Sequence, residues 1–343
     1  MELNQIVQQY LGIGDFQSSE IVSGLINTTL LIEKNGEKYI LQKINHGVFL
    51  EPEALVNNHL QINLVLKNAD YQREIIDIIP TLEGGLLLKD SQEHFWRMTR
   101  FVENATTFLK VPNKEIALEA AICLSEFYRI INEKQLLIQD PLLGFINFKK
   151  RTDDFISALE SASEERKIKA SEEIKAIKNQ LHLPEKWLQL LEEEKLPKRI
   201  IHADPKISNI LFDCKEKATA VIDLDTIMED SILYDFGDMV RSYCNKTDED
   251  DATLQENFDG EIYKVIKQGF LSKLEDLLTD SEKENLDYAA QVVIYIQAVR
   301  FLSDYLNNDS YYHTNYPDHN LDRTKNQLQL LKNLQDYQNT VPI

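Results

Sequence analysis

The hydrophobic pattern of this chain changes near residue 103, and that change constrains the fold more than any other feature of the sequence. Before it, short apolar runs are separated by turn signals, and the Asn35-Gly36 pair between two strand-like runs is typical of a β-hairpin. After Glu103-Asn104 the apolar residues recur mostly with helical spacing. We therefore expect an α+β, two-lobed fold with a small antiparallel β lobe over residues 1–103 and a larger, mostly helical lobe over residues 104–343.

The two halves of the chain predict different elements. The first is expected to hold about five strands, within residues 32–41, 73–79, 86–89 and 94–102, and one helix over residues 51–67. The second is expected to hold helices over residues 113–135, 150–195 and 233–343, with short strands at 210–212 and 220–222. We expect a short hinge near residues 99–104 to join the lobes, with a nucleotide in the cleft between them.

The composition excludes several classes of partner. The 343 residues carry a net charge of −20, which repels nucleic-acid phosphates and anionic lipid. Three isolated cysteines without C-x-x-C spacing predict free thiols in a reducing compartment. The start of the chain shows no secretory signal, and the apolar helix candidate Ala289 to Leu302 is too short and polar to span a membrane. We expect a cytoplasmic protein with no nucleic-acid or membrane partner; the residues leave its oligomeric state open.

The residues with the strongest chemical signal lie between 201 and 223. Residues 201–209 are Ile-His-Ala-Asp-Pro-Lys-Ile-Ser-Asn, and Asp223 ends an apolar run fourteen residues after Asn209. Magnesium-dependent phosphoryl transfer needs a carboxylate that accepts the hydroxyl proton and oxygen ligands that hold the metal. We predict that Asp204 is the base and that Asn209 and Asp223 bind Mg²⁺. Each residue alone would be a turn or cap residue, but their combination predicts an ATP-dependent kinase.

Further side chains are candidates for contact with the reactants. Lys206 is placed to neutralise the γ-phosphate, unless it is simply a solvated lysine. Asp225 points the same way as Asp223 in extended geometry, so it is a candidate for the metal shell or the substrate, with a structural acid as the alternative. Arg300 interrupts an apolar helix and needs a partner, either an internal acid or a polar substrate. Asp235 is expected to cap the next helix and to brace the loop that carries Asp204.

The nucleotide phosphates are expected near the N-terminus. The turn at residues 23–29, Ser-Gly-Leu-Ile-Asn-Thr-Thr, could present backbone N–H groups to phosphate oxygens, and its candidates are Gly24, Asn27, Thr28 and Thr29. An ordinary hairpin turn is the alternative.

The phosphate-binding cation should lie on the strand at residues 39–44. Lys43 is the candidate, but the strand puts Gln42 on the opposite face, and the pattern does not decide which face looks into the cleft. Glu53 in the following helix is a possible partner for this cation. Arg100 and Phe101, in the hinge segment, are the remaining candidates for contact with ATP.

These motifs together resemble the aminoglycoside phosphotransferase and choline kinase-like superfamily. The resemblance rests on residues 202–209, on Val221-Ile222-Asp223-Leu224-Asp225-Thr226 and on Tyr234-Asp235-Phe236-Gly237-Asp238. Residues 26–29, 39–46, 300–306 and 316–321 are further similar to the N-acetylhexosamine 1-kinases, so the resemblance runs nearly from end to end. The superfamily often has Lys or Arg where this chain has Gln42, which leaves the phosphate contact open between Lys43 and Gln42.

The resemblance implies a two-lobed kinase-like fold that uses ATP and Mg²⁺. It further implies transfer of the γ-phosphate to the anomeric hydroxyl of N-acetylglucosamine or N-acetylgalactosamine, a small-molecule sugar substrate. Carried over, Asp204 is the base, Asn209 and Asp223 hold the metal, and Arg300 contacts the sugar, with Tyr311 as a further candidate for stacking on it.

Three alternatives accompany this interpretation. Another small-molecule kinase of the same fold would act on choline, homoserine or an aminoglycoside, but a cationic acceptor calls for an acidic or aromatic pocket rather than Arg300. A protein kinase is disfavoured because D-F-G and A-P-E signals are missing and Ala203 stands where the catalytic-loop Arg would be. A catalytically inactive nucleotide-binding scaffold is disfavoured because Asp204, Asn209 and Asp223 are all present.

Overall fold

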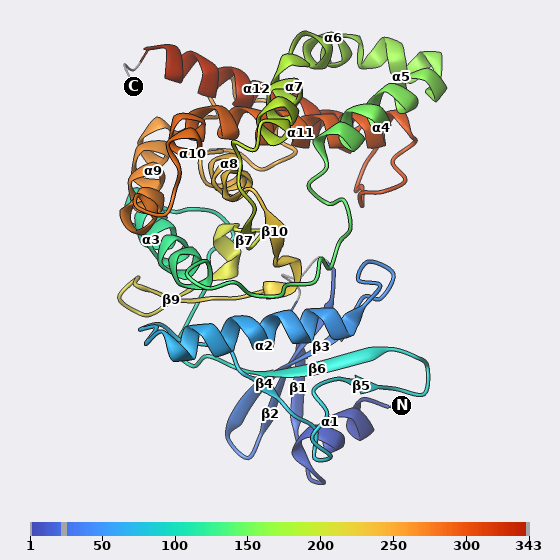
Figure 1. Ribbon diagram of the computed structural model, residues 1–343. Helices are drawn as coiled ribbons and strands as arrows, with labels where there is room; N and C mark the ends of the chain where they lie inside the picture. The colour runs from blue at the N-terminus through green and yellow to red at the C-terminus, as the bar shows by residue number, and fades with distance from the viewer. Residues whose placement is uncertain (1, 22–25, 341–343) are drawn as a thin grey trace. The chain divides into compact units, whose positions relative to one another are not determined.

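The computed structural model describes residues 2–21 and 26–340 (Figure 1). The chain forms two compact units, each assembled from several stretches of sequence. Unit 1 comprises Met1–Thr107, Phe127–Leu143 and Asn209–Glu229, and unit 2 comprises Phe108–Glu126, Gly144–Ser208 and Asp230–Ile343. Unit 1 is built around an antiparallel sheet and unit 2 is helical, which confirms the α+β class.

The sheet of unit 1 has the strand order β1-β2-β3-β6-β4, and β5 pairs with β6. Neighbouring strands are antiparallel, and β2 and β3 form the hairpin predicted at Asn35-Gly36. Both residues of that turn have positive φ, 54° and 80°, as the tight turn requires. The strands are β1 (Gln17–Glu20), β2 (Thr28–Lys34), β3 (Glu37–Ile44), β4 (Ile78–Ile79), β5 (Leu88–Lys89) and β6 (Phe95–Arg100).

One face of this sheet is covered by the N-terminal helix α1 (Leu3–Leu11). Its apolar side chains Ile6, Val7 and Tyr10 form one buried cluster with residues of β3 and β6, among them Leu41 and Met98. The Tyr10 hydroxyl donates to the carbonyl of Trp96 at 2.7 Å, so the buried phenol is satisfied. Helix α1 is not among the elements predicted from the sequence, although its apolar residues follow helical spacing.

Two further parts of unit 1 matter for the site. The long helix α2 (Pro52–Asn68) packs against the short 3₁₀ segment η2 (Leu224–Thr226). A hairpin of β8 (Ile210–Phe212) and β9 (Ala218–Val221) carries η2 at its end and the 3₁₀ segment η1 (Ile207–Asn209) at its start. The strand predicted at 210–212 is therefore confirmed, and the one predicted at 220–222 is present as β9, which begins at Ala218 and ends at Val221.

Unit 2 is organised around α11, whose buried face contacts α12, α8, α4, α7 and α6 (Figure 1). Gly237 of α8 allows this helix to lie close to α11, because a Cβ there would lie 2.6 Å from Cγ2 of Val293. The helices of this part of the chain are α3 (Lys114–Ile131, which continues into unit 1), α4 (Phe148–Ser161), α5 (Glu164–Lys169), α6 (Ser171–Asn179), α7 (His182–Glu192), α8 (Ile232–Tyr243), α9 (Gly260–Leu274), α10 (Asp280–Glu284), α11 (Leu286–Leu306) and α12 (His319–Thr340). The remaining two strands are β7 (Arg199–Ile201) and β10 (Met228–Asp230).

Some element predictions need correction. The sheet contains six strands within the described residues, rather than about five. The strand expected over residues 73–79 is reduced to β4, because the backbone N–H of Glu74 donates instead to the carbonyl of Thr219 in β9. Asp235 does not cap α8; Ser231 is the N-cap, and Asp235 lies in the first turn.

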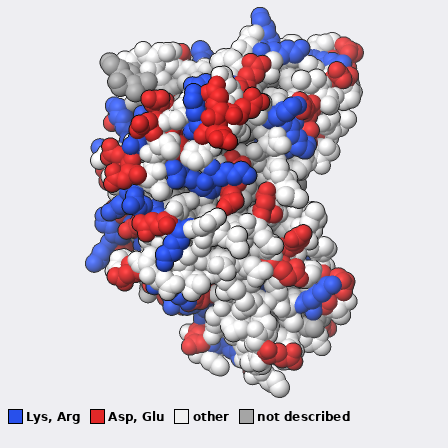
Figure 2. All heavy atoms as spheres, viewed as in Figure 1, with Lys and Arg blue, Asp and Glu red and all other residues white. Residues whose placement is uncertain are grey.

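In the described part of the chain, no helix combines the length and apolar character needed to cross a membrane. On the face shown in Figure 2, acidic and basic side chains are interspersed and form no large patch of one sign.

Candidate active site

The loop that carries Asp204 is held by a buried carboxylate on α8. Asp235 is fully buried and accepts hydrogen bonds from the backbone N–H groups of His202 at 2.7 Å and Ala203 at 3.0 Å. Ala203 has a φ of 62°, a conformation that needs outside support in a non-glycine residue. The predicted bracing of the loop by Asp235 is therefore confirmed.

The neighbours of Asp204 come from the same loop. Nζ of Lys206 lies 2.7 Å from Oδ2 of Asp204, and both side chains are partly exposed. The loop is also held at Pro205, whose carbonyl accepts from the Tyr243 hydroxyl at 3.0 Å. The structure thus presents Asp204 on a rigid loop, with the predicted phosphate-neutralising lysine beside it.

The two predicted metal ligands are brought together in unit 1 by the β8–β9 hairpin. Ile210 pairs with Val221, and the N–H of Ile222 donates to the carbonyl of Asn209 at 2.9 Å. Asp223 is the next residue and turns the chain with a φ of 61°. The hairpin register therefore makes Asn209 and Asp223 neighbours, although fourteen residues separate them.

This donor set suits Mg²⁺. Carboxylate and amide oxygens are hard ligands, and magnesium usually keeps several waters and takes only one or two protein ligands beside phosphate oxygens. Within residues 2–21 and 26–340, no group of three His, Cys, Asp or Glu side chains could hold an ion by itself. Asn209 and Asp223 fit an ion that is shared with a nucleotide, rather than a site built from protein alone.

Asp225, two residues further on, is buried in a polar network. Its Oδ1 lies 2.5 Å from NH1 of Arg97 on β6, and its Oδ2 accepts from Nδ2 of Asn27 at 2.7 Å. The side chains of Asp225 and Arg97 are only 3% and 4% exposed. Arg97 is not among the site residues predicted from the sequence. A charged residue in the aromatic strand at 94–102 nevertheless indicates a buried cation that needs a partner, as Arg300 does in its apolar helix.

The register of the sheet separates Gln42 from Lys43. Thr29, Gln42 and Arg97 are directly opposite one another on β2, β3 and β6. Arg97 donates to Oε1 of Gln42 from Nε at 3.0 Å and from NH2 at 2.7 Å, and Gln42 donates to the Thr29 hydroxyl at 3.2 Å. Lys43 is paired with Trp96 on the other face, the one covered by α1. Gln42, and not Lys43, therefore shares a face with Arg97 and its partner Asp225.

The other predicted nucleotide contacts are spread over unit 1. Gly24 lies outside the described residues. Asn27 precedes β2, and its Oδ1 also accepts from the N–H of Asn45 at 2.9 Å. Thr28 begins β2 and is exposed. Among these candidates, Asn27 is the one that the structure joins directly to Asp225.

The predicted hinge residues have partners of their own. Arg100 ends β6 and forms an ion pair with Glu74. Nζ of Lys38 lies 5.7 Å from the ring centre of Phe101. Glu53, the possible partner for the β3 cation, is exposed on α2. Contact of Arg100 and Phe101 with ATP stays a prediction.

Arg300 lies in an aromatic cluster of unit 2. Its guanidinium is 5.4 Å from the ring centre of Phe145 and 5.6 Å from that of Tyr312, and it donates to Oε1 of Gln297 at 3.0 Å. Burial and then the nearby charge of Arg300 lower the pKa of Arg151. Two guanidinium groups thus share one partly buried cluster, which sequence reasoning did not foresee.

The loop beside Arg300 is fixed by a second buried acid. Asp304, one turn along α11, accepts from the backbone N–H groups of Tyr311 at 2.8 Å and Tyr312 at 2.9 Å. The Tyr311 side chain is 70% exposed. An exposed aromatic ring on a fixed backbone can stack on a ligand at low entropic cost, which keeps Tyr311 a candidate.

Unit 2 joins this cluster to the Asp204 loop through consecutive residues of α8. The ring of Tyr234 packs edge-on against Phe145, with ring centres 6.5 Å apart. The next residue, Asp235, holds the backbone at His202 and Ala203. One helical turn therefore supports both the Arg300 cluster and the loop of Asp204.

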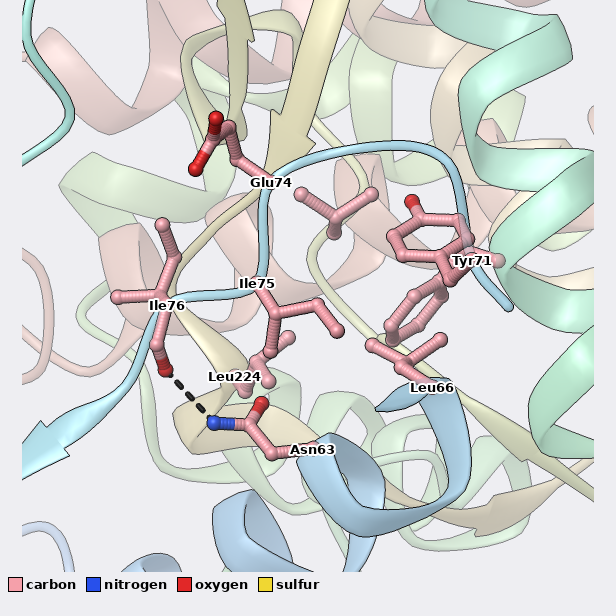
Figure 3. A pocket seen from close by; sticks show the side chains of 9 residues that line it. Asn63, Leu66, Tyr71, Glu74, Ile75, Ile76 and Leu224 are labelled. Carbon is pink, nitrogen blue, oxygen red and sulfur yellow. Dashed lines mark hydrogen bonds between the residues drawn. The ribbon is translucent and has the colours of Figure 1, made fainter. Parts of the chain in front are cut away.

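A small pocket lies against residues 221–226, the segment that carries the predicted metal ligand Asp223 and that we call the metal loop (Figure 3). Its volume of about 10 Å³ has room for one water molecule at most, so it holds no nucleotide. Leu224, the residue after Asp223, lies beside Ile75 and Asn63, and Nδ2 of Asn63 donates to the carbonyl of Ile76 at 2.8 Å. These contacts anchor the metal loop on α2 and on the segment before β4.

Comparison with known families gives one match that covers most of the chain. Residues 18–266 match the model of the APH family, described as the phosphotransferase enzyme family. The matched region contains Asp204, Asn209, Asp223 and the Arg97–Asp225 pair, and it ends before Arg300.

Solved structures with the same fold include several small-molecule kinases. A spectinomycin phosphotransferase in complex with ADP and spectinomycin is 14% identical, with a TM-score of 0.63 and 97% of each chain covered. A microcompartment-associated aminopropanol kinase is 15% identical, with a TM-score of 0.63 and coverage of 98% of this chain and 97% of the other. A choline kinase from Streptococcus pneumoniae is 12% identical, with a TM-score of 0.55 and coverage of 96% and 97%. At these identities the likeness shows the fold.

Proposed function

The chain belongs to the phosphotransferase enzyme family, and from this premise we propose that it transfers the γ-phosphate of ATP to the anomeric hydroxyl of N-acetylglucosamine or N-acetylgalactosamine. The family makes the protein a phosphotransferase with an alcohol group as acceptor. Beyond the family, we propose ATP as the phosphate donor, Mg²⁺ as the metal, an N-acetylhexosamine as the acceptor, and a role for each residue that contacts them.

Asp204 is proposed as the base. Its carboxylate would accept the proton of the attacking hydroxyl as the phosphoryl group is transferred. The hydrogen bonds from His202 and Ala203 to Asp235 support this role, because they fix the backbone next to Asp204. Lys206, 2.7 Å from Asp204, would meet the negative charge of the γ-phosphate oxygens.

Asn209 and Asp223 are proposed to hold the magnesium ion. Bound Mg²⁺ would neutralise charge on the β- and γ-phosphates of ATP. The backbone pairing that places the two residues side by side at the end of the β8–β9 hairpin supports the assignment. Asn27, just before β2, and Thr28 and Thr29, at the start of β2, would lie along the phosphates, with Gln42 opposite Thr29 and with Arg100 and Phe101 as further contacts to the nucleotide. Lys43 lies on the face of β3 that α1 covers and would not contact the phosphates.

The observation that carries the choice of acceptor is the pair of arginines in unit 2. Arg300 faces the rings of Phe145 and Tyr312, and its charge lowers the pKa of Arg151 after the effect of burial. Two guanidinium groups repel a cationic acceptor such as choline, an amino alcohol or an aminoglycoside. They suit a neutral acceptor rich in oxygen, such as the acetamido carbonyl and hydroxyls of an N-acetylhexosamine. The exposed ring of Tyr311, which packs edge-on against Tyr312, would stack on the sugar ring.

The direct test is ADP release from ATP and Mg²⁺ with a panel of acceptors. The panel contains N-acetylglucosamine, N-acetylgalactosamine, glucose, choline, aminopropanol, homoserine and spectinomycin. We expect turnover with the N-acetylhexosamines and a product that has lost its reducing end, as the 1-phosphate must.

Two variants make this test specific. Asp204→Asn should lower kcat by about 10²- to 10⁴-fold, the range for loss of a general base. Asp336→Asn, a matched change of an exposed Asp on α12, should leave kcat unchanged. Turnover only with choline, aminopropanol or spectinomycin would overturn the sugar assignment and favour the second candidate, a kinase for cationic alcohols on the same scaffold.

A further inference from the structure

The burial of the Arg97–Asp225 ion pair is not explained by a contribution to the stability of the fold. Both side chains are nearly inaccessible, and their closest atoms are 2.5 Å apart. Removing two charges from water costs several kcal/mol per ion, so a buried pair is weak grounds for stability and is best explained by what it holds in place. Here it joins a strand of the sheet to the residue two positions after Asp223.

The pair is the centre of a network in unit 1 that joins β2, β3 and β6 to the loop that carries Asp223. From Arg97 the contacts run to Gln42 on β3, and from Gln42 to Thr29 on β2. From Asp225 they run to Asn27 in the turn before β2, and from Asn27 to the backbone of Asn45 after β3. All of these residues belong to one compact unit.

This network also supplies a cation beside Gln42, an uncharged residue of β3. In protein kinases a Lys on the third strand contacts the phosphates and pairs with a Glu from a helix. In this chain Gln42 holds the corresponding face, Lys43 points to the face under α1, and Glu53 of α2 is exposed. On the Gln42 face, the cation is Arg97 of β6, and its acidic partner is Asp225 of the metal loop.

We propose that Arg97 is the positioning residue of the nucleotide site, acting through Asp225 to fix Asp223 and Asn27, and through Gln42 to fix Thr29 at the start of β2. This inference rests on the proposed function, since it assigns a role at the same site. Partners that orient metal ligands typically change metal affinity or activity by about 10- to 100-fold when they are mutated. We therefore expect mutation of Arg97 to weaken the binding of MgATP and to leave the binding of the acceptor unchanged.

The test must separate positioning from simple structural support. Arg97→Gln alone leaves the buried Asp225 without its cation, which strongly destabilises the fold and would hide an effect on positioning. The double variant R97Q/D225N removes both charges and leaves two amides that can hydrogen-bond to each other. We expect this double variant to keep a thermal midpoint close to that of the wild type.

The measurements are the binding of MgADP by calorimetry and the steady-state constants. For R97Q/D225N we expect MgADP binding and KM for MgATP to weaken by about 10-fold or more, with a higher Mg²⁺ concentration needed for half-maximal rate. KM for the acceptor should stay within about twofold. Arg97→Lys, which keeps the charge but not the planar fork, should be intermediate.

The outcomes are distinct for the two proposals. A double variant that binds MgADP like the wild type would overturn the role of Arg97 and leave the kinase assignment intact. A larger loss from Lys43→Gln than from R97Q/D225N would also overturn it, because the phosphates would then lie on the other face. Failure of the wild type itself to bind MgADP would overturn the proposed function, and the inference with it.

Discussion

The carboxylate of Asp235 accepts the backbone N–H of His202 at a distance of 2.7 Å. The same carboxylate accepts the N–H of Ala203, and no part of Asp235 is exposed. These bonds hold the left-handed turn at Ala203 and thereby fix the direction in which Asp204 leaves the loop.

The variant Asp235→Asn tests this support. An amide has one acceptor oxygen, and its NH₂ group would face N–H donors, so we expect the free energy of unfolding to fall by about 3 kcal/mol. We also expect kcat to fall, because the loop of Asp204 is loosened. Denaturant unfolding and steady-state kinetics measure the two effects, with Asp336→Asn as the control. A loss of kcat with unchanged stability would mean that Asp235 acts on the reactants directly.

The acceptor site is tested by Arg300→Met, which removes the guanidinium and keeps most of the apolar stem. We expect KM for the sugar to rise by about 10-fold or more, as for a lost hydrogen bond from a charged group, while KM for ATP changes little. The matched control is Arg129→Met, a partly exposed arginine on α3 whose partner is Glu133. An equal rise in both KM values would contradict a specific contact between Arg300 and the sugar.

His59 predicts a pH dependence of stability. It is buried on α2, and its Nε2 lies 2.7 Å from the carbonyl of Ile76. Burial first, and then the charge of Arg97, lower its pKa from 6.5 to about 4, although Ile76, Asp225 and Asp77 act in the opposite direction. Between these values the unfolded chain binds more protons than the folded one. The stability that His59 contributes is therefore fully present above pH 6.5 and is lost as the pH falls toward 4.

The variant His59→Gln keeps a side-chain donor and removes this titration. We expect the free energy of unfolding of the wild type to fall by about 3 kcal/mol more than that of the variant between pH 7 and pH 4. Urea unfolding at a series of pH values measures the difference, and His46→Gln, an exposed histidine, is the control. Parallel curves for wild type and His59→Gln would show that His59 is not the group responsible.

Gly237→Ala tests the close contact between α8 and α11. The new Cβ would lie 2.6 Å from Cγ2 of Val293 and 2.7 Å from the carbonyl oxygen of Ala289. One of these is backbone, so the helices must separate, and we expect a loss of about 1–3 kcal/mol in the free energy of unfolding. Gly85→Ala is the control, because its Cβ would make contacts no shorter than 3.4 Å. Equal stability of both variants would contradict the tight packing at Gly237.

The sequence predicted the fold class and the local parts of the site for a common reason. A hairpin at Asn35-Gly36, the long helix α2 and the strands around 210 and 221 depend on interactions between residues close in the chain. The motif of Asp204, Asn209 and Asp223 is also compact, because one short hairpin makes the last two neighbours. Such features are encoded by spacing, and spacing is visible in a sequence.

The tertiary structure alone decided the pairing of distant side chains. Arg97 and Asp225 meet because the metal loop packs against one face of the sheet, and nothing in either local pattern names the partner. The same contact shows which face of β3 carries Gln42 with this network and which carries Lys43, a choice that strand alternation alone left open. In unit 2, the meeting of Arg300 with Phe145 and the effect of its charge on Arg151 likewise follow from helix packing. Periodicity fixes which residues share a face, but only the packed chain fixes what that face meets.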